Sequence, residues 1–226
     1  MTAAPRIALI HATPLAVDPI RAAFERLWPQ ARRMNLLDDS LSVDRAEAGR
    51  LTDAMVERFI TLARYAQGTG AGGILFTCSA FGPAIEAAGR ATGLPTLKPN
   101  QAMFDDALAL AQPGRTLKLG LLATFEASIP SMAEELQQLA AARGMAVDLR
   151  TAFVPEAMDD LAAGRPADHH RRIAQAARSL ADRDAVMLAQ FSMAAAAPEA
   201  QQQLPCPVLS SPDCAVRALM QTMRDA

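Results

Sequence analysis

Cysteine and aromatic residues are scarce in this sequence, and neither positive nor negative charge is in large excess. The three cysteines are odd in number, and they form neither a CxxC pair nor a cluster with histidine. We therefore predict neither a disulfide framework nor a metal site, and we expect reduced thiols in the cytoplasm. The 22 Lys and Arg residues are scattered among 24 acids, so nucleic acid is not an expected partner. No apolar run approaches the roughly 20 residues that span a membrane, so no membrane contact is expected.

The sequence does contain a regular alternation of short apolar runs and longer amphipathic segments. The apolar runs suit parallel strands that are covered on both faces, and the segments between them suit helices. This alternation predicts an α/β fold with right-handed crossovers. The expected strands cover residues 6–12, 32–37, 73–78, 95–98, 118–123, 146–153, 185–190 and 207–210.

The longest expected helix runs over 43–66 as a single element. Its apolar residues keep one face, Ser42 suits the N-cap, and Gly68 suits the stop. A later helix begins near His169 and His170. Neighbouring histidines do not share a helix face, so we expect both on a solvated surface rather than in a metal site.

Three pairs of short segments repeat at a nearly constant spacing. ALIHAT (8–13) resembles GLLAT (120–124), ILFTCSAF (74–81) resembles VMLAQFSM (186–193), and LPTL (94–97) resembles CPVL (206–209), at offsets of 111, 112 and 112 residues. We infer two similar, pseudo-symmetric lobes, each a parallel β-sheet flanked by helices. Lobe 1 covers 1–112, with the C-terminal segment free to pack back onto it, and lobe 2 covers 113–226. Ligands bind at the carboxyl ends of parallel strands, so the active site is expected in the cleft between the lobes.

Cys78 ends an expected strand and precedes an expected helix over 79–88, which makes it the leading candidate for chemistry. Free backbone amides and the positive end of the helix dipole would favour its thiolate. Thr77 and Ser79 add hydroxyl donors, and the amides of this turn, that of Ala80 included, could hold a substrate carboxylate. A structural cysteine is the alternative, because free cysteine is among the most buried residue types.

The paired motifs ILFTCSAFGPAIEAA in the first half and VMLAQFSMAAA in the second resemble the aspartate/glutamate racemase superfamily over nearly the whole chain. That superfamily includes glutamate, aspartate and hydantoin racemases, maleate isomerase and arylmalonate decarboxylase. The resemblance implies an enzyme without a cofactor, a small carboxylate or amino-acid substrate, and a homo-oligomer. It also implies a racemase mechanism in which one cysteine removes the α-proton and a second cysteine returns it from the opposite side.

This sequence departs from the two-cysteine pattern. Cys78 falls on the first cysteine position, but the second position falls on Gln190, which cannot exchange a proton at neutral pH. The departure argues against a symmetric two-thiol racemase and leaves one-cysteine chemistry. Within the superfamily, that chemistry is either protonation of a carbanion after decarboxylation or addition of a thiolate to a double bond. Gln190 would then donate a hydrogen bond to a substrate oxygen.

Further candidates lie near the ends of the expected strands. His11 could move a proton or be a structural histidine. Thr13 and Thr124, taken as equivalent positions of the repeat, could bind a ligand oxygen or cap a helix. Of the adjacent carboxylates, Asp38 is assigned to the cleft and Asp39 to a cap. The remaining expected substrate contacts are Phe125, as a pocket wall, and Ser192.

The sequence thus favours a cofactor-independent enzyme of the racemase or isomerase type. It would act at the carbon α to a carboxylate of a small acid or amino acid, with Cys78 as thiol acid/base or nucleophile. The runner-up is a single-cysteine decarboxylase of a malonate-like acid. A non-catalytic carboxylate-binding protein is a further alternative, and a thiol hydrolase ranks last.

Overall fold

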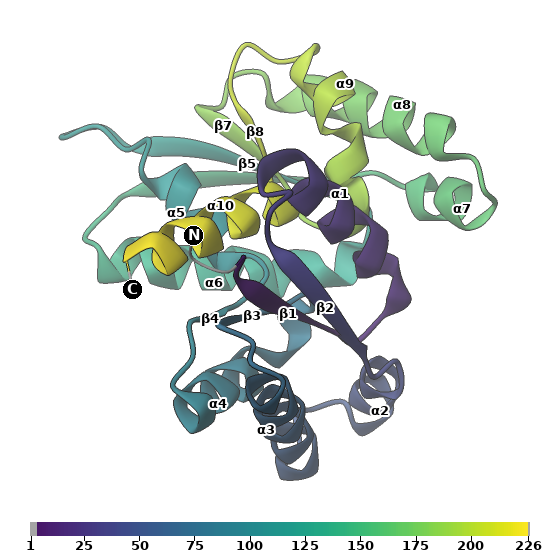
Figure 1. Ribbon diagram of the computed structural model, residues 1–226. Coiled ribbons are helices and arrows are strands. Elements are labelled where there is room, and N and C mark those ends of the chain that lie inside the picture. Colours follow the sequence, from purple (N-terminus) through teal and green to yellow (C-terminus); the bar gives the residue numbers. More distant parts are fainter. Residues whose placement is uncertain (1–3, 226) are drawn as a thin grey trace. The chain divides into compact units, whose positions relative to one another are not determined.

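The computed structural model describes residues 4–225. The chain divides into a first unit, formed by residues up to Ala102 together with those from Ala215 onward, and a second unit, Met103–Cys214. Each unit contains one four-stranded parallel sheet flanked by helices (Figure 1). The predicted α/β fold with two parallel sheets is therefore confirmed.

In the first unit the strand order is β2-β1-β3-β4. The central strands are buried along nearly their whole length, whereas the edge strand β2 is partly exposed, which explains the continuous apolar runs of the central strands. Short 3-10 turns, labelled η, follow β1 and β3. The elements are β1 (Arg6–His11), η1 (Pro14–Ala16), α1 (Val17–Leu27), β2 (Arg32–Leu37), α2 (Ser40–Ala48), α3 (Asp53–Gly68), β3 (Gly73–Phe76), η2 (Ser79–Phe81), α4 (Gly82–Thr92), β4 (Thr96–Leu97) and most of α10 (Ser211–Asp225).

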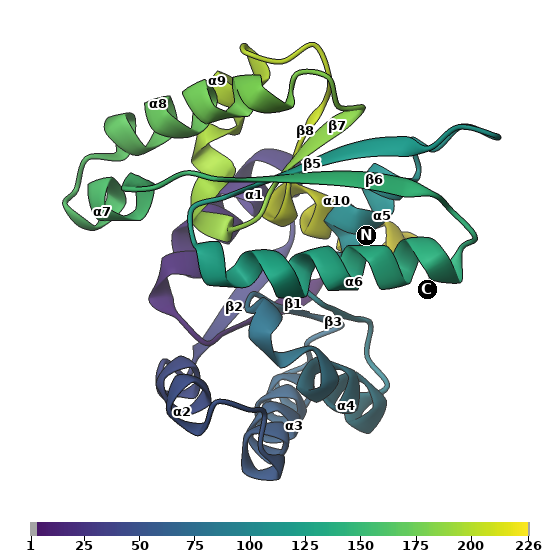
Figure 2. The ribbon, with the colours of Figure 1, turned by 180° about the vertical axis from the view of Figure 1, so that it is seen from behind.

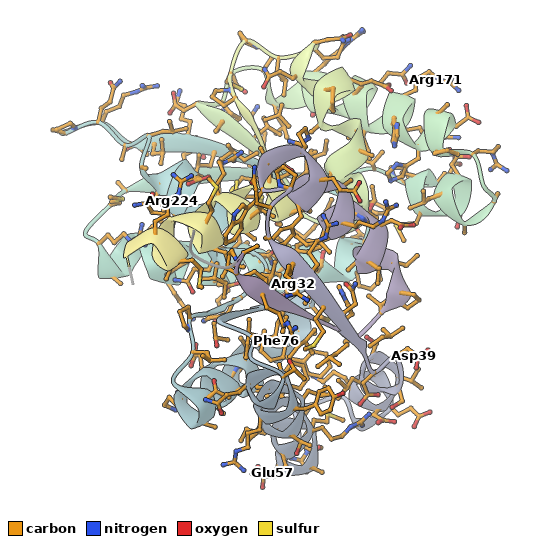
Figure 3. The ribbon with its side chains drawn as sticks, viewed as in Figure 1. Arg32, Asp39, Glu57, Phe76, Arg171 and Arg224 are labelled. Carbon is orange, nitrogen blue, oxygen red and sulfur yellow. The ribbon has the colours of Figure 1, made fainter. Side chains whose placement is uncertain are left out.

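Helices α3 and α4 pack side by side against one face of this sheet (Figure 1). The ring of Phe59 stacks on that of Phe76 with centroids 5.0 Å apart and lies 4.7 Å from that of Phe81. Figure 3 shows Phe76 between the strand and the helices, with Glu57 on the outer side of α3. This cluster anchors the turn that follows β3, because Phe81 belongs to that turn and is fully buried.

The single helix expected over 43–66 is wrong. The structure has α2 and α3 instead, with Gly49 in a left-handed conformation (φ 64°) at the end of α2. Helix α3 then starts afresh, and the Thr52 hydroxyl accepts the Met55 N–H at 3.3 Å. Ser42 lies inside α2 rather than at its N-cap. The glycine stop and the threonine cap outweigh the continuous apolar face, because glycine adopts positive φ without strain.

In the second unit the strand order is β6-β5-β7-β8, so both sheets have the same topology. Figure 2 shows α6 on one side of this sheet, with α8 and α9 on the other. The elements are α5 (Gln101–Leu108), which starts at the unit boundary, β5 (Leu117–Ala123), η3 (Glu126–Ser128), α6 (Ile129–Ala142), β6 (Val147–Phe153), α7 (Ala157–Ala162), α8 (Pro166–Ala177), η4 (Arg178–Leu180), β7 (Ala185–Leu188), η5 (Phe191–Ala196), α9 (Ala197–Gln201) and β8 (Val208–Ser210).

The register of the two sheets confirms the repeat and corrects one of its details. The backbone N–H groups of Thr77 and Ala189 donate to the carbonyl oxygens of Ile10 and Leu122 at 3.1 and 2.9 Å. Both residues of the second pair lie 112 positions after those of the first. Thr124 is therefore the counterpart of Ala12, and the predicted equivalence of Thr13 and Thr124 is wrong by one residue. Hydrogen bonding fixes the register, whereas a match of five or six letters tolerates a one-residue slip.

The predicted solvated surface is wrong for His169. The imidazole is fully buried in α8, and neither ring nitrogen has a hydrogen-bond partner among residues 4–225. Ile173 and Ala177 are buried on the same helix face, at spacings of four and eight residues. That spacing carries the signal for burial, and the charged neighbours of His169 in the sequence obscured it. His170 is only partly exposed and lies 3.7 Å from Glu199.

Candidate active site

Cys78 lies just beyond the carboxyl end of β3, at the N-cap position of η2, with an extended backbone (φ −122°, ψ 121°). Its side chain is partly exposed and packs against the apolar cluster between the sheet and helices α3 and α4. The predicted helix over 79–88 is split in the structure, because α4 begins only at Gly82. Cys206 and Cys214 are not joined in a disulfide, and both are buried.

Burial raises the pKa of the Cys78 thiol above its ordinary value. The Ala80 N–H and the Ser42 side chain act in the opposite direction through hydrogen bonds to the sulfur, without outweighing burial. The Ser42 hydroxyl also donates to the Ala12 carbonyl at 2.6 Å. The expected thiolate is therefore not the resting form at neutral pH: the turn amide lowers the pKa as predicted, but the apolar cluster dominates.

The structure does not bring His11 to the thiol. His11 and Thr77 occupy one face of the sheet, and Cys78 belongs to the cluster on the other. The imidazole is fully buried, with Nδ1 2.9 Å from Thr77 Oγ1 and Nε2 3.0 Å from Asn35 Oδ1. Burial lowers the pKa of His11, and the bond to Asn35 offsets this only in part. A neutral His11 therefore cross-links β1, β2 and β3.

Two other predicted contacts of the first unit have partners within that unit. The Thr13 hydroxyl accepts the Leu15 N–H at 3.4 Å and so caps η1. The Asp38 carboxylate pairs with Arg58 at 2.5 Å. Burial works to raise the pKa of Asp38, but hydrogen bonds from Arg58 and Ser40 outweigh it and hold the pKa below its ordinary value. Ser79 and Ala80 are exposed beside Cys78.

Gln190 is the counterpart of Cys78 in the second unit, since it holds the N-cap position of η5 after β7. Its Oε1 accepts the Thr124 N–H at 2.8 Å and the Thr124 hydroxyl at 3.2 Å, and its Nε2 donates to Ser128 Oγ at 2.7 Å. Thr124 is buried. Phe125 is 57% exposed, and Ser192 is half-buried two residues beyond Gln190.

Three polar residues of these networks escaped the sequence analysis: Asn35, Ser42 and Ser128. Ser42 was interpreted only as a helix cap, although its place in the first turn of α2 brings it to Cys78. Asn35 lies on the edge strand β2, which contains no fully buried residue, so the burial pattern of the strand does not single it out. Nothing in the sequence distinguishes Ser128 from other surface serines.

No group of three or more His, Cys, Asp or Glu side chains within residues 4–225 could hold a metal ion. No helix in the same range is both long and apolar enough to cross a membrane.

Comparison with known proteins finds one matching sequence family. The sequence model of the Asp/Glu/Hydantoin racemase family matches residues 10–219. A search of curated protein sequences found no match.

Solved structures of that class share the fold. Allantoin racemase from Klebsiella pneumoniae is 17% identical with a TM-score of 0.70, over 98% of this chain and 88% of that one. An aspartate racemase homologue from Pyrococcus horikoshii OT3 is 15% identical with a TM-score of 0.69, over 96% and 98%. Arylmalonate decarboxylase is 21% identical with a TM-score of 0.64, over 96% and 92%. At these identities the likeness establishes the fold.

Proposed function

Because this chain belongs to the Asp/Glu/Hydantoin racemase family, we propose that it is a cofactor-independent enzyme of the racemase or isomerase type. The substrate is a small acid or amino acid, the reacting carbon is the one α to its carboxylate, and Cys78 is the acid/base or nucleophilic thiol. Family membership supports the reaction type, and the position of Cys78 supports the residue.

The main observation that supports a role for Cys78 in the reaction is its position in the fold. Cys78 is a partly exposed residue at the carboxyl edge of a parallel sheet, the edge at which such folds bind ligands. The Ala80 N–H and the Ser42 side chain already bond the sulfur, so both can stabilise negative charge there when the proton leaves.

A single thiol can act in two directions. As a thiolate, Cys78 removes the α-proton, and the electron pair moves into the carboxylate to give an enediolate. As a thiol, it returns a proton to the same carbon, and the configuration is inverted when the planar enediolate has turned its opposite face to the sulfur. The exposed Ser79 lies next in the chain, where its backbone N–H can bind an enediolate oxygen while the Ala80 N–H bonds the sulfur. Thiolate addition to a substrate double bond is the nucleophilic form of the same chemistry.

A second candidate is decarboxylation of a malonate-like acid, and the state of Cys78 favours it. Burial keeps the sulfur protonated, which suits a group that must give a proton to the carbanion left when carbon dioxide departs. Gln190 has no ionisable group, and its carboxamide is engaged by Thr124 and Ser128. One proton donor is sufficient for decarboxylation, whereas racemisation by two thiols requires a second.

Turnover in heavy water separates these functions. A panel of amino acids and small diacids is incubated with the enzyme and followed by proton NMR. Exchange of the α-proton with inversion supports the racemase, carbon dioxide release with one deuterium in the product acid supports the decarboxylase, and double-bond isomerisation supports the nucleophilic form. Saturable binding without any of these reactions would show a carboxylate-binding protein and refute the proposal.

The matched pair of variants is Cys78→Ser and Cys206→Ser. Both replace a sulfur by oxygen, but Cys206 is a buried free thiol in the core of the second unit. Cys78→Ser is expected to abolish turnover while the circular dichroism spectrum is retained, and Cys206→Ser is expected to keep turnover. Full activity in Cys78→Ser would remove Cys78 from the mechanism.

A further inference from the structure

Gln190 is held by three hydrogen bonds, all within the second unit. Its side-chain oxygen accepts both the N–H and the hydroxyl of Thr124, and its side-chain nitrogen donates to the Ser128 hydroxyl oxygen. Thr124 is 4% exposed. Two donors of one residue therefore converge on a single oxygen, and a third polar group meets the other end of the same planar carboxamide.

We propose that Thr124 and Ser128 form a seat for a carboxylate, and that the Gln190 carboxamide fills it as an internal ligand. A carboxamide and a carboxylate are planar groups of the same size, and both present an sp² oxygen to donors. The seat is thus a binding site occupied by the protein's own side chain. Its ligand class is a small monocarboxylate such as acetate.

The donors that hold the Gln190 oxygen also suit a carboxylate oxygen. Both Thr124 groups donate, which suits an anion, because hydrogen bonds to a charged acceptor are stronger than those to a neutral one. The Ser128 hydroxyl accepts from Gln190 and donates to the Phe125 carbonyl at 2.7 Å. Rotation of that one hydroxyl turns Ser128 into a third donor, so a second carboxylate oxygen would be bonded without any movement of the backbone.

The filled seat has a consequence that rests on the proposed function. With Thr124 and Ser128 engaged by Gln190, this seat cannot accept a substrate carboxylate in the wild-type protein. The seat itself involves only residues of the second unit, and its test does not require Cys78 to have any chemistry.

The test is acetate binding followed at the Thr124 backbone amide by ¹H–¹⁵N NMR. Acetate is titrated against sodium chloride at equal ionic strength into the wild-type protein and into Gln190→Ala, which vacates the seat. We expect a saturable shift of the Thr124 amide in Gln190→Ala, with an affinity at least about tenfold above that of the wild-type protein. Removing the hydroxyl with Thr124→Val in the same background should weaken binding roughly threefold or more.

The matched control is Gln138→Ala, because Gln138 is an exposed glutamine of the same unit whose side-chain nitrogen donates to Glu134 at 3.1 Å. It should behave as the wild-type protein does. An equal Thr124 response to acetate in the wild-type protein and Gln190→Ala, or no response in either, overturns the proposal.

A second variant keeps the proposal testable if an empty seat compromises folding. Gln190→Glu places a carboxylate on a side chain of the same length. The two Thr124 donors should lower the pKa of the introduced carboxyl by at least about one unit from the ordinary value near 4.3, as read by ¹³C NMR. An unshifted or raised pKa would count against the seat whatever the enzyme's activity.

Discussion

His11 and Cys78 lie on opposite faces of the first unit's sheet, although both stand at the carboxyl ends of neighbouring strands. Side chains alternate along a strand, so two residues at one sheet edge can be separated by the sheet itself. The thiol lies with the α3 and α4 cluster, whereas the imidazole bonds Thr77 and Asn35 on the far side. This arrangement assigns different roles to the two residues.

Replacing His11 by Leu should cost stability without changing the chemistry of the thiol. The variant leaves the buried Thr77 hydroxyl without its imidazole partner, so the free energy of unfolding should fall by about 1–3 kcal/mol in urea denaturation. The pH profile of Cys78 alkylation by iodoacetamide should coincide with that of the wild-type protein. A displacement of that profile by a full pH unit would show that the imidazole does communicate with the sulfur.

Replacing Ser42 by Ala should raise the pKa of Cys78 further. The Ser42 side chain bonds the sulfur, and a hydrogen bond to a charged group contributes on the order of 1.5 kcal/mol, equivalent to about one pKa unit. The alkylation profile should therefore move upward by about one unit. Ser40→Ala is the control, since Ser40 belongs to the same helix as Ser42 but its hydroxyl donates to Asp38. Similar profiles for both variants would exclude the Ser42 bond.

The fold could be predicted largely from the sequence, because strand burial and turn residues are local signals. All eight expected strands exist, and β2 matches its predicted bounds. The break between α2 and α3 was missed, since the apolar spacing continues through Gly49. His169 was misplaced because the charges beside it in the sequence outweighed its spacing from Ile173.

The candidate site was predicted less completely, because side-chain partners are long-range. Cys78 and Gln190 could be paired from the repeat, and both hold the N-cap position of the 3-10 turn that follows the third strand of their sheet. The raised pKa of Cys78 depends on the cluster with α3 and α4, which no local pattern reveals. The partners of Gln190 are 62 and 66 residues away in sequence.

Two phenylalanines that follow candidate site residues should differ in what their truncation changes. Phe81 is fully buried three residues after Cys78, so Phe81→Ala should lower the free energy of unfolding by about 3–5 kcal/mol. Phe125 is 57% exposed, and Phe125→Ala should change stability by no more than about 0.5 kcal/mol. If Phe125 walls the substrate pocket, its truncation should raise KM instead. Urea denaturation and steady-state kinetics measure the two effects, and comparable stability losses would contradict the assigned environments.

Acidification should destabilise the protein through its buried histidines. Burial lowers the pKa of His169, as does His170, while Asp160 only partly offsets this, and burial also lowers that of His11. Below the unfolded-state pKa of about 6.5 the unfolded chain therefore binds protons that the folded chain does not. Stability is complete above that pH and falls below it by up to about 1.4 kcal/mol per pH unit for each histidine. His169→Leu should reduce by one the number of protons taken up on unfolding between pH 7 and pH 5, as read from urea denaturation. His170→Asn, at a partly exposed position, should leave that number unchanged. An unchanged slope in His169→Leu would mean that the imidazole is protonated, and therefore solvated, in the folded protein.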